Sequence, residues 1–281
     1  MKIEQNMILD FSHIYPEDVE KQAPGLKRID LSDIPGTDMY CTREAEKEIR
    51  RRLSPYGPRG IHFLDNGNYH YVTKFFAGKI REPFSLVLYD HHSDMQKPLF
   101  PGMTSCGSWA GELLLHHPYL RQMILAGPEQ KSMEELPEEL EEVLTEPGER
   151  PGKIRKQPGE PGKQAREKLV CISREEIENK AMDGKISRID MTVPVYISID
   201  KDVLDRSGAR TNWDQGEMPL AVLEKLLLEV FVHQQVIGVD ICGECSLLEP
   251  LQELMEDERI NRLTNERLHH FLTRLFREFA A

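Results

Sequence analysis

The chain has 281 residues, a formal net charge of −12 and a hydrophobic content of 39%. This length allows one large domain or two small ones, with enough apolar residues for a sizeable core. The acidic balance argues against a nucleic-acid binder, which would carry a basic face. No apolar run approaches the roughly 18 residues of a membrane span, and the N-terminus lacks a signal-like pattern. We therefore expect a cytoplasmic protein without a membrane partner.

Short apolar runs recur along the chain and have the composition of buried strands. They lie at residues 7–11, 61–64, 84–89, 122–126, 169–172, 193–199 and 236–239. Most are continuous rather than alternating, as in parallel strands that are covered on both faces. Between them, residues 43–53 are polar and helix-prone, and residues 219–234 and 256–280 carry apolar side chains at helical spacing. This alternation predicts an α/β fold with a mostly parallel sheet.

One stretch, residues 129–168, interrupts the alternation. It is acidic at first and then becomes basic and rich in proline and glycine. The first half is compatible with a surface helix, and the second half has the composition of a flexible loop. We predict a solvated, flexible insertion within a single domain that spans residues 1–281. A partner-docking arm or a lid is the alternative.

The most informative feature is a set of acidic and histidine side chains that follow strand-like runs. Residues 88–94 read Leu-Tyr-Asp-His-His-Ser-Asp, and residues 198–202 read Ser-Ile-Asp-Lys-Asp. Side chains at positions i, i+2 and i+4 of an extended segment point the same way, so these groups can converge on one point. The candidate metal ligands are His70, Asp90, His92, Asp94, Asp200 and Asp202.

The charges of this set point to two metal ions. Four crowded carboxylates would repel one another unless cations neutralised them, and two divalent ions carry the matching charge. Oxygen-rich ligation favours Mn²⁺, although other divalent ions are compatible. Two such ions can bridge a water and lower its pKa, which yields a hydroxide nucleophile. An Asp-x-Asp after a strand could by itself be only a helix cap, but the combined pattern predicts a metal-dependent hydrolase.

These motifs resemble those of the ureohydrolase family, which comprises the arginases, agmatinases and formimidoylglutamases. The matching segments are residues 67–70, 90–94 and 198–205, in the same order and with similar spacing. The resemblance implies an arginase-like three-layer α/β/α fold with two manganese ions at the strand ends, bridged by Asp200. It also implies hydrolysis of a linear C–N bond in a guanidino, amidino or formimino compound. Because the family is often trimeric or hexameric, a homo-oligomer is an open alternative for this chain.

Three positions depart from the family pattern. Tyr69 stands where the family usually has a carboxylate beside the first histidine, and Cys106 stands where arginases have a proton-shuttling histidine. The counterpart of the acidic residue that holds the cationic head of the substrate is Glu244, with one extra residue before it. If the strand continued, Cys242 and Glu244 would share a face, and the Glu244 carboxylate could pair with a guanidinium or amidinium group. An ordinary strand-end charge is the alternative for Glu244.

The resemblance also suggests further site residues. Trp213 and Asp214 follow the second motif in a loop that overlies the active site in the family. An aromatic ring beside an acid suits a small cationic substrate, although Trp213 could equally pin the loop to the core. We expect Asp202 or another metal-ligating carboxylate to accept the proton, and we treat Cys106 and Glu244 as further catalytic candidates.

The cysteines give a weaker signal. The chain has five cysteines, an odd number that does not suggest a disulfide framework. Cys242 and Cys245 form a C-x-x-C, which could serve in redox chemistry or zinc binding. The preferred interpretation is two small residues at the end of a strand.

Two other functions remain open. Deacetylases share the broader fold and use one zinc ion with an Asp/His/Asp set, here Asp90, His92 and Asp202; they need neither His70 nor Asp94. A non-catalytic protein could instead keep the metal site for structure and use residues 129–168 to bind a partner. Retention of all six candidate ligands favours the binuclear hydrolase.

Overall fold

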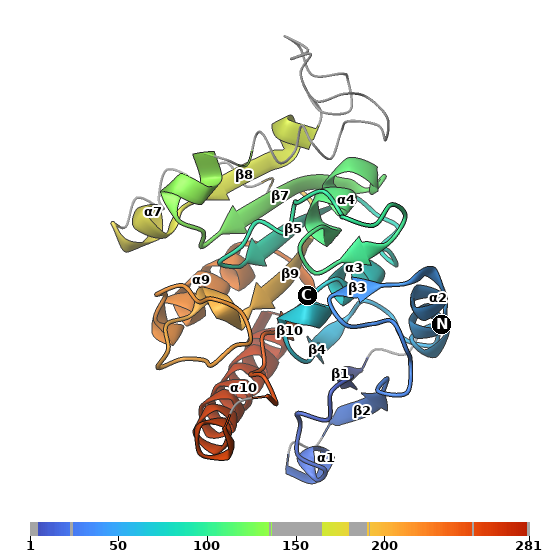
Figure 1. Cartoon of the computed structure of the whole chain (residues 1–281). Coiled ribbons are helices and arrows are strands. Elements are labelled where there is room, and N and C mark those ends of the chain that lie inside the picture. Colours follow the sequence, from blue (N-terminus) through green and yellow to red (C-terminus); the bar gives the residue numbers. More distant parts are fainter. Residues whose placement is uncertain are drawn as a thin grey trace.

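A parallel sheet of eight strands organises the chain in the computed structural model (Figure 1). The structure describes residues 5–22, 25–134, 136, 165–179, 190, 192–248 and 250–279. The strand order is β2-β1-β4-β10-β9-β5-β7-β8, and every neighbouring pair is parallel. The strands are β1 (Asn6–Asp10), β2 (Leu26–Asp30), β4 (Gly60–Phe63), β5 (Phe84–Tyr89), β7 (Leu120–Ala126), β8 (Leu169–Ile172), β9 (Val195–Asp200) and β10 (Val236–Cys242). Two short strands, β3 (Tyr40–Cys41) and β6 (Thr104–Ser105), form a separate antiparallel pair.

The seven predicted strands are confirmed, and β2 is the strand of the eight-stranded sheet that the sequence did not predict. Strands β5, β9 and β10 are buried along their whole length, which explains their continuous apolar sequences. Strand β2 lies at the edge of the sheet and has only one fully buried residue, Leu26. An edge strand with Lys27, Arg28 and Asp30 carries no apolar run, so the sequence pattern passes over it.

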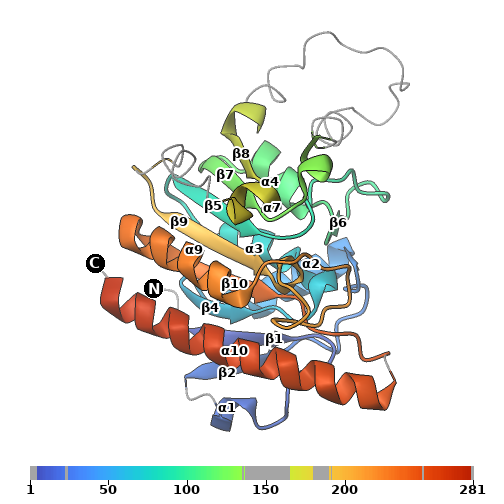
Figure 2. The ribbon, with the colours of Figure 1, turned by 90° about the vertical axis from the view of Figure 1, so that its left-hand side faces the viewer.

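Helices cover both faces of the sheet and make three layers (Figure 2). Helices α2 (Arg43–Arg52), α3 (Val72–Ala77) and α4 (Trp109–His116) contribute to the core on one face. Helices α9 (Leu220–His233) and α10 (Leu251–Phe279) contribute to the core on the other face, where they pack side by side. Shorter pieces include α1 (Val19–Gln22), α7 (Arg174–Glu178) and the 3₁₀ turns η1 (Gly67–Tyr69) and η2 (Lys201–Val203). The predicted α/β/α architecture with a parallel sheet is therefore confirmed.

Helix positions agree with the sequence pattern where a helix is amphipathic and long. Helices α2 and α9 match the predicted ranges closely, and α10 begins at Leu251, five residues before the predicted start at 256. Helices α3 and α4 were not predicted. Both are short and almost wholly buried, so they lack the polar face that reveals a surface helix.

The order of the strands decides where polar side chains can meet. Strands β4, β10, β9 and β5 are consecutive neighbours in the middle of the sheet. Because they are parallel, the segments that follow their carboxyl ends lie along one edge, the usual place for sites in such sheets. Most of the predicted insertion at residues 129–168 lies outside the described residues. Among the described helices, none is long and apolar enough to cross a membrane.

Candidate metal centre

His70 is positioned by the segment that follows β4. It ends the 3₁₀ turn η1, which Asn66 caps by accepting a hydrogen bond from the backbone N–H of Asn68 at 3.0 Å. The ring of His70 is buried, and its Nε2 lies 2.8 Å from the hydroxyl of Ser198 on β9. This contact fixes the orientation of the ring and leaves Nδ1 facing the carboxylates of the centre.

Three carboxylates surround that nitrogen. The distances from His70 Nδ1 are 3.0 Å to Asp94, 3.3 Å to Asp90 and 3.4 Å to Asp200. All four side chains are buried, although they come from three different parts of the chain. One imidazole nitrogen and three carboxylates therefore face a common point.

The loop after β5 supplies two of the acids and the second histidine. The Asp90 carboxylate accepts a hydrogen bond from the backbone N–H of His92 at 2.7 Å. Asp94 has φ of 53°, in the left-handed region that side-chain-bearing residues rarely adopt. Its carboxylate accepts a hydrogen bond from the indole of Trp109, at the start of α4, at 2.5 Å. The unusual backbone of Asp94 thus turns its side chain back towards His70.

The end of β9 supplies the other two acids. Asp200 is the last residue of the strand and Asp202 lies in η2, where the backbone N–H of Asp202 donates to Asp200 at 2.9 Å. Asp202 also lies 2.8 Å from His92 Nδ1 and accepts the backbone N–H of His91 at 3.0 Å. Lys201, between the two acids, points to the other side and is fully buried.

The structure brings together all six candidate ligands. Two groups of donor atoms, each within 4.8 Å of one another, share Asp90. The first group joins His70, Asp90 and Asp94, and the second joins Asp90, His92 and Asp202. Asp200 belongs to neither group, but its carboxylate lies 3.4 Å from His70 Nδ1. Two adjacent cation positions, each with one imidazole, fit this arrangement of donors.

The electrostatics of the centre also fit cations. Burial and the charges of Asp202 and Asp94 raise the pKa of Asp90 well above its usual range, and burial together with Asp202 raises the pKa of Asp200 to about 6. Burial lowers the pKa of His92, but its hydrogen bond to Asp202 and the nearby carboxylates outweigh this effect and raise the pKa to about 11. One oxygen of Asp90 is buried without a hydrogen-bond partner among the described residues. The raised pKa values mean that Asp90, Asp200 and His92 bind protons, which partly neutralise the negative charge of the centre. Divalent ions at the same place would neutralise this charge instead.

A cavity of about 230 Å³ opens onto the centre, and Trp213 and Asp214 lie at the His92 side. The Trp213 ring lines the cavity 5.9 Å from the His92 ring, and its Nε1 donates to the Asn68 side chain at 2.9 Å. Asp214 is 76% exposed and lies 3.1 Å from His92 Nε2. Trp213 therefore both pins its loop and borders the cavity, so the two sequence interpretations coexist.

Cys106 also lines this cavity. Its side chain is buried, and burial together with the charge of Asp94 raises the pKa of its thiol to about 12. A thiol with this pKa stays protonated near neutrality, so it does not exchange protons as an imidazole does. A catalytic role for Cys106 stays a prediction.

Glu244 lies elsewhere, contrary to the sequence-based expectation. Strand β10 ends at Cys242, and Gly243, with φ of 92°, turns the chain before Glu244. The Glu244 carboxylate accepts hydrogen bonds from Lys201 Nζ and from the Asn265 amide on α10, both at 2.7 Å. It lines a second cavity against α10 and is absent from the lining of the metal cavity. The expected strand continuation is broken at Gly243, so the Glu244 side chain points away from the cavity at the candidate metal centre.

Cys242 takes the place at the centre that the sequence analysis gave to Glu244. Its thiol donates to the Asp200 carboxylate at 3.0 Å and is fully buried. Cys245 packs into the core on the other face of the sheet, and both cysteines are free. The C-x-x-C is therefore not a pair. Cys242 could have been identified from its position at the end of a predicted strand, if that strand had been expected to lie beside the one that bears Asp200.

The pKa shift of Asp200 predicts how the metal-free protein responds to pH. Because this pKa is raised to about 6, the native state keeps a proton that the unfolded chain releases from about pH 4 upwards, and stability is lost as pH rises. Asp200→Asn removes that loss. In EDTA, the free energy of unfolding of the variant relative to wild type should increase by about 1–3 kcal/mol between pH 4 and pH 7. Urea denaturation measures this difference.

Divalent metal provides the control for that experiment. With saturating Mn²⁺ the wild type should gain stability as pH rises, because metal binds the deprotonated ligands. Asp200→Asn should gain much less. If, in EDTA, the free energy of unfolding of the wild type rises relative to that of Asp200→Asn as pH increases, the charge crowding described for this centre is contradicted.

The burial of Glu244 predicts a structural role. Glu244→Gln leaves the ammonium of Lys201 buried without a countercharge, so it should lower the free energy of unfolding by about 3 kcal/mol. Glu256→Gln is the matched control on α10, where the ion pair with Arg259 is exposed, and it should leave the free energy of unfolding nearly unchanged. Urea denaturation compares the two. A stable Glu244→Gln protein with a strongly raised KM would return this carboxylate to substrate binding.

Known proteins were compared with this chain by sequence and by structure. No protein-family model matches it. A Thermotoga maritima protein described as uncharacterized is 29% identical over 269 residues, which cover 94% of this chain and 91% of the relative. The formimidoylglutamase of Bacillus subtilis has a TM-score of 0.59 and 15% identity, with 97% of this chain and 88% of that chain covered. The proclavaminate amidino hydrolase of Streptomyces clavuligerus has a TM-score of 0.59 and 14% identity, covering 96% and 92%.

The structural likeness covers nearly the whole chain, at low sequence identity. Arginases and agmatinases also match over nine-tenths of it or more. The resemblance of the motifs to the ureohydrolases is thereby confirmed at the level of fold, and the chain has the arginase-like α/β fold.

Proposed function

We propose that this chain is a binuclear-metal hydrolase that cleaves a linear C–N bond in a guanidino, amidino or formimino compound. The observation that carries the proposal is the pair of donor groups that share Asp90, each with one histidine. The proposal treats residues 1–281 as one arginase-like catalytic domain. The names of structural neighbours, a formimidoylglutamase and an amidino hydrolase, support this class of substrate.

The ligand types guide the choice of metal. At the His92 position, the donors are imidazole nitrogen and carboxylate oxygen, which suit Mn²⁺. Manganese at both positions was the prediction from the sequence. At the His70 position, the thiol of Cys242 lies near His70 and Asp200, and the choice of ion there depends on that thiol.

Two bound divalent ions would supply a hydroxide nucleophile and polarise the bond that is cleaved. The chain itself holds and orients the reacting groups. Ser198 and Asp214 each contact the outward nitrogen of one histidine and fix its ring. Asp202 already accepts the backbone N–H of His91 with one oxygen. Its other oxygen faces His92, and we assign it the role of proton acceptor.

Substrate recognition falls to the cavity mouth, because Glu244 faces away. The Trp213 ring and the exposed Asp214 carboxylate lie side by side there, and both attract a cationic group. We propose that they bind the charged part of the substrate. This binding site would be more open to solvent than a buried carboxylate, so it would accept larger substrates.

The proposed centre predicts the effect of removing single ligands. Asp94→Asn and Asp202→Asn keep the side-chain shape but remove one negative charge, so each should reduce turnover to below roughly a tenth of wild type. The assay is a screen of guanidino, amidino and formimino compounds with Mn²⁺ present. Asp33→Asn, on an exposed ion pair with Arg52, is the control and should retain activity. Near-full activity in folded Asp94→Asn and Asp202→Asn proteins contradicts the proposal.

Metal content separates this proposal from the alternatives. The set Asp90, His92 and Asp202 on its own matches a one-zinc deacetylase, but the buried His70 group beside it favours a second ion. Elemental analysis of the purified protein should give about two divalent ions per chain. One zinc per chain would support the deacetylase. Two bound ions without turnover of any guanidino or acylamino compound, together with a defined partner, would support a non-catalytic protein.

A further inference from the structure

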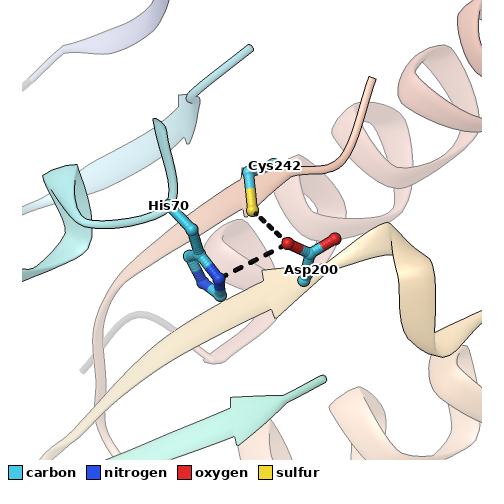
Figure 3. A group of neighbouring side chains, drawn as sticks. All are labelled: His70, Asp200 and Cys242. Carbon is cyan, nitrogen blue, oxygen red and sulfur yellow. Dashed lines mark hydrogen bonds and ion pairs between the residues drawn. The ribbon is translucent and has the colours of Figure 1, made fainter. Parts of the chain in front are cut away.

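Cys242 meets two of the proposed metal ligands at the end of β10. Figure 3 shows His70, Asp200 and Cys242, which come from three separate segments and point toward one another. Cys242 Sγ lies 3.0 Å from an oxygen of Asp200, and the same oxygen lies 3.4 Å from His70 Nδ1. The three donor atoms are all within 4.8 Å of one another. These separations are compatible with donors on a single metal ion.

The backbone holds the thiol in this place. Strand β10 lies between β4 and β9, and Cys242 pairs in register with Asp200. At Gly243 an added Cβ would lie 2.6 Å from Asp200 Oδ1 and 2.8 Å from the Lys201 nitrogen. Only glycine fits there with its positive φ, and it turns the following residue to the other face. The thiol therefore stays at the strand end, against the Asp200 carboxylate.

A second observation indicates that this part of the centre accepts a cation. Asp90 is fully buried, and one of its oxygens has no hydrogen-bond partner among the described residues. That oxygen lies 3.3 Å from His70 Nδ1. A carboxylate buried in this way is stabilised by a positive ion, and His70, which this Asp90 oxygen faces, also has a donor nitrogen within 4.8 Å of Cys242 Sγ.

We propose that Cys242 is a ligand of the metal ion on the His70 side, so that the two metal positions differ in chemistry. This inference rests on the proposed binuclear centre. The His70 position would have nitrogen, oxygen and sulfur donors, whereas the His92 position has nitrogen and oxygen donors alone. Thiolate sulfur favours Zn²⁺, Fe²⁺ or Co²⁺ over Mn²⁺. The centre would thus bind a thiophilic ion at one position and a harder ion at the other.

Metal binding exchanges one bond of the thiol for another. The S–H bond of Cys242 breaks, a sulfur–metal bond forms, and the proton leaves to water. Asp200 loses its hydrogen bond from the thiol and gains a bond to the metal. The thiolate adds one negative charge to four carboxylates that two divalent ions already balance. This extra charge selects for an ion whose bond to sulfur is strong.

Cobalt makes a sulfur ligand visible. The full-length protein is stripped of metal and reconstituted with Co²⁺, and the near-ultraviolet spectrum is recorded for a thiolate-to-cobalt charge-transfer band. The band should be present in wild type and lost in Cys242→Ser. Cys245→Ser is the matched control, because Cys245 is equally buried three residues further on but packs on the other face; it should keep the band.

Metal preference gives a second measurement that does not depend on activity. With Zn²⁺ and Mn²⁺ in competition, Cys242→Ser should lower the retention of zinc relative to manganese by about tenfold or more, as measured by elemental analysis. If Cys242→Ser does not fold, X-ray absorption of the zinc-loaded wild type serves instead. One sulfur neighbour at about 2.3 Å from zinc is expected.

The outcomes distinguish this inference from the proposed function. A wild type that binds two Co²⁺ ions without the band, or a Cys242→Ser protein that keeps it, overturns the cysteine ligand and leaves the binuclear hydrolase intact. X-ray absorption that shows only nitrogen and oxygen neighbours around zinc likewise overturns the cysteine ligand and leaves the binuclear hydrolase intact. A folded wild type that binds no divalent ion overturns both.

Discussion

The structure depends on negative charge concentrated at the carboxyl ends of four neighbouring strands. Asp90, Asp94, Asp200 and Asp202 are buried within contact distance of two histidines. Buried like charges are unfavourable unless cations or donors balance them. Backbone N–H groups of the ligand loops and the indole of Trp109 donate to these carboxylates. The surrounding side chains thus preorganise an arrangement that only divalent cations fully neutralise.

A second buried charge pair stabilises the back of the centre. At the end of β9 the 3₁₀ turn η2 places Asp200 and Asp202 at the candidate metal centre and Lys201 towards α10. There Lys201 meets Glu244, and Asn265 of α10 bonds to both. The long terminal helix therefore contacts the ligand segment through polar bonds as well as through the core. A carboxylate expected at the substrate acts here as a structural partner of the metal-binding segment.

This reassignment separates the chemistry of the centre from the recognition of its substrate. The ligand set agrees with the family that the motifs resemble, and the fold is shared with a formimidoylglutamase and an amidino hydrolase. Substrate choice is not a property of a fold. In this chain it would depend on Trp213 and Asp214 at the cavity mouth and on Cys106 in its wall. If Cys242 binds one of the metals, the centre would also prefer a different ion from a centre that has only nitrogen and oxygen ligands.

The sequence by itself determined the features that depend on neighbours along the chain. Continuous apolar runs predicted the buried strands, because burial on both faces shows in a strand's own sequence. The six candidate ligands were predicted from motifs that follow such runs, although extended alternation does not gather them: Asp94 has a positive φ and Asp202 lies in the turn η2. The tertiary structure alone decided what depends on strand order and on where a strand stops. The edge position of β2 hid it from the pattern. The positive φ of Gly243 ended β10 at Cys242, which turned Glu244 away and left Cys242 against Asp200. Spacing in the sequence cannot reveal such a turn, because its cause is the close approach of Asp200 and Lys201 from the adjacent strand.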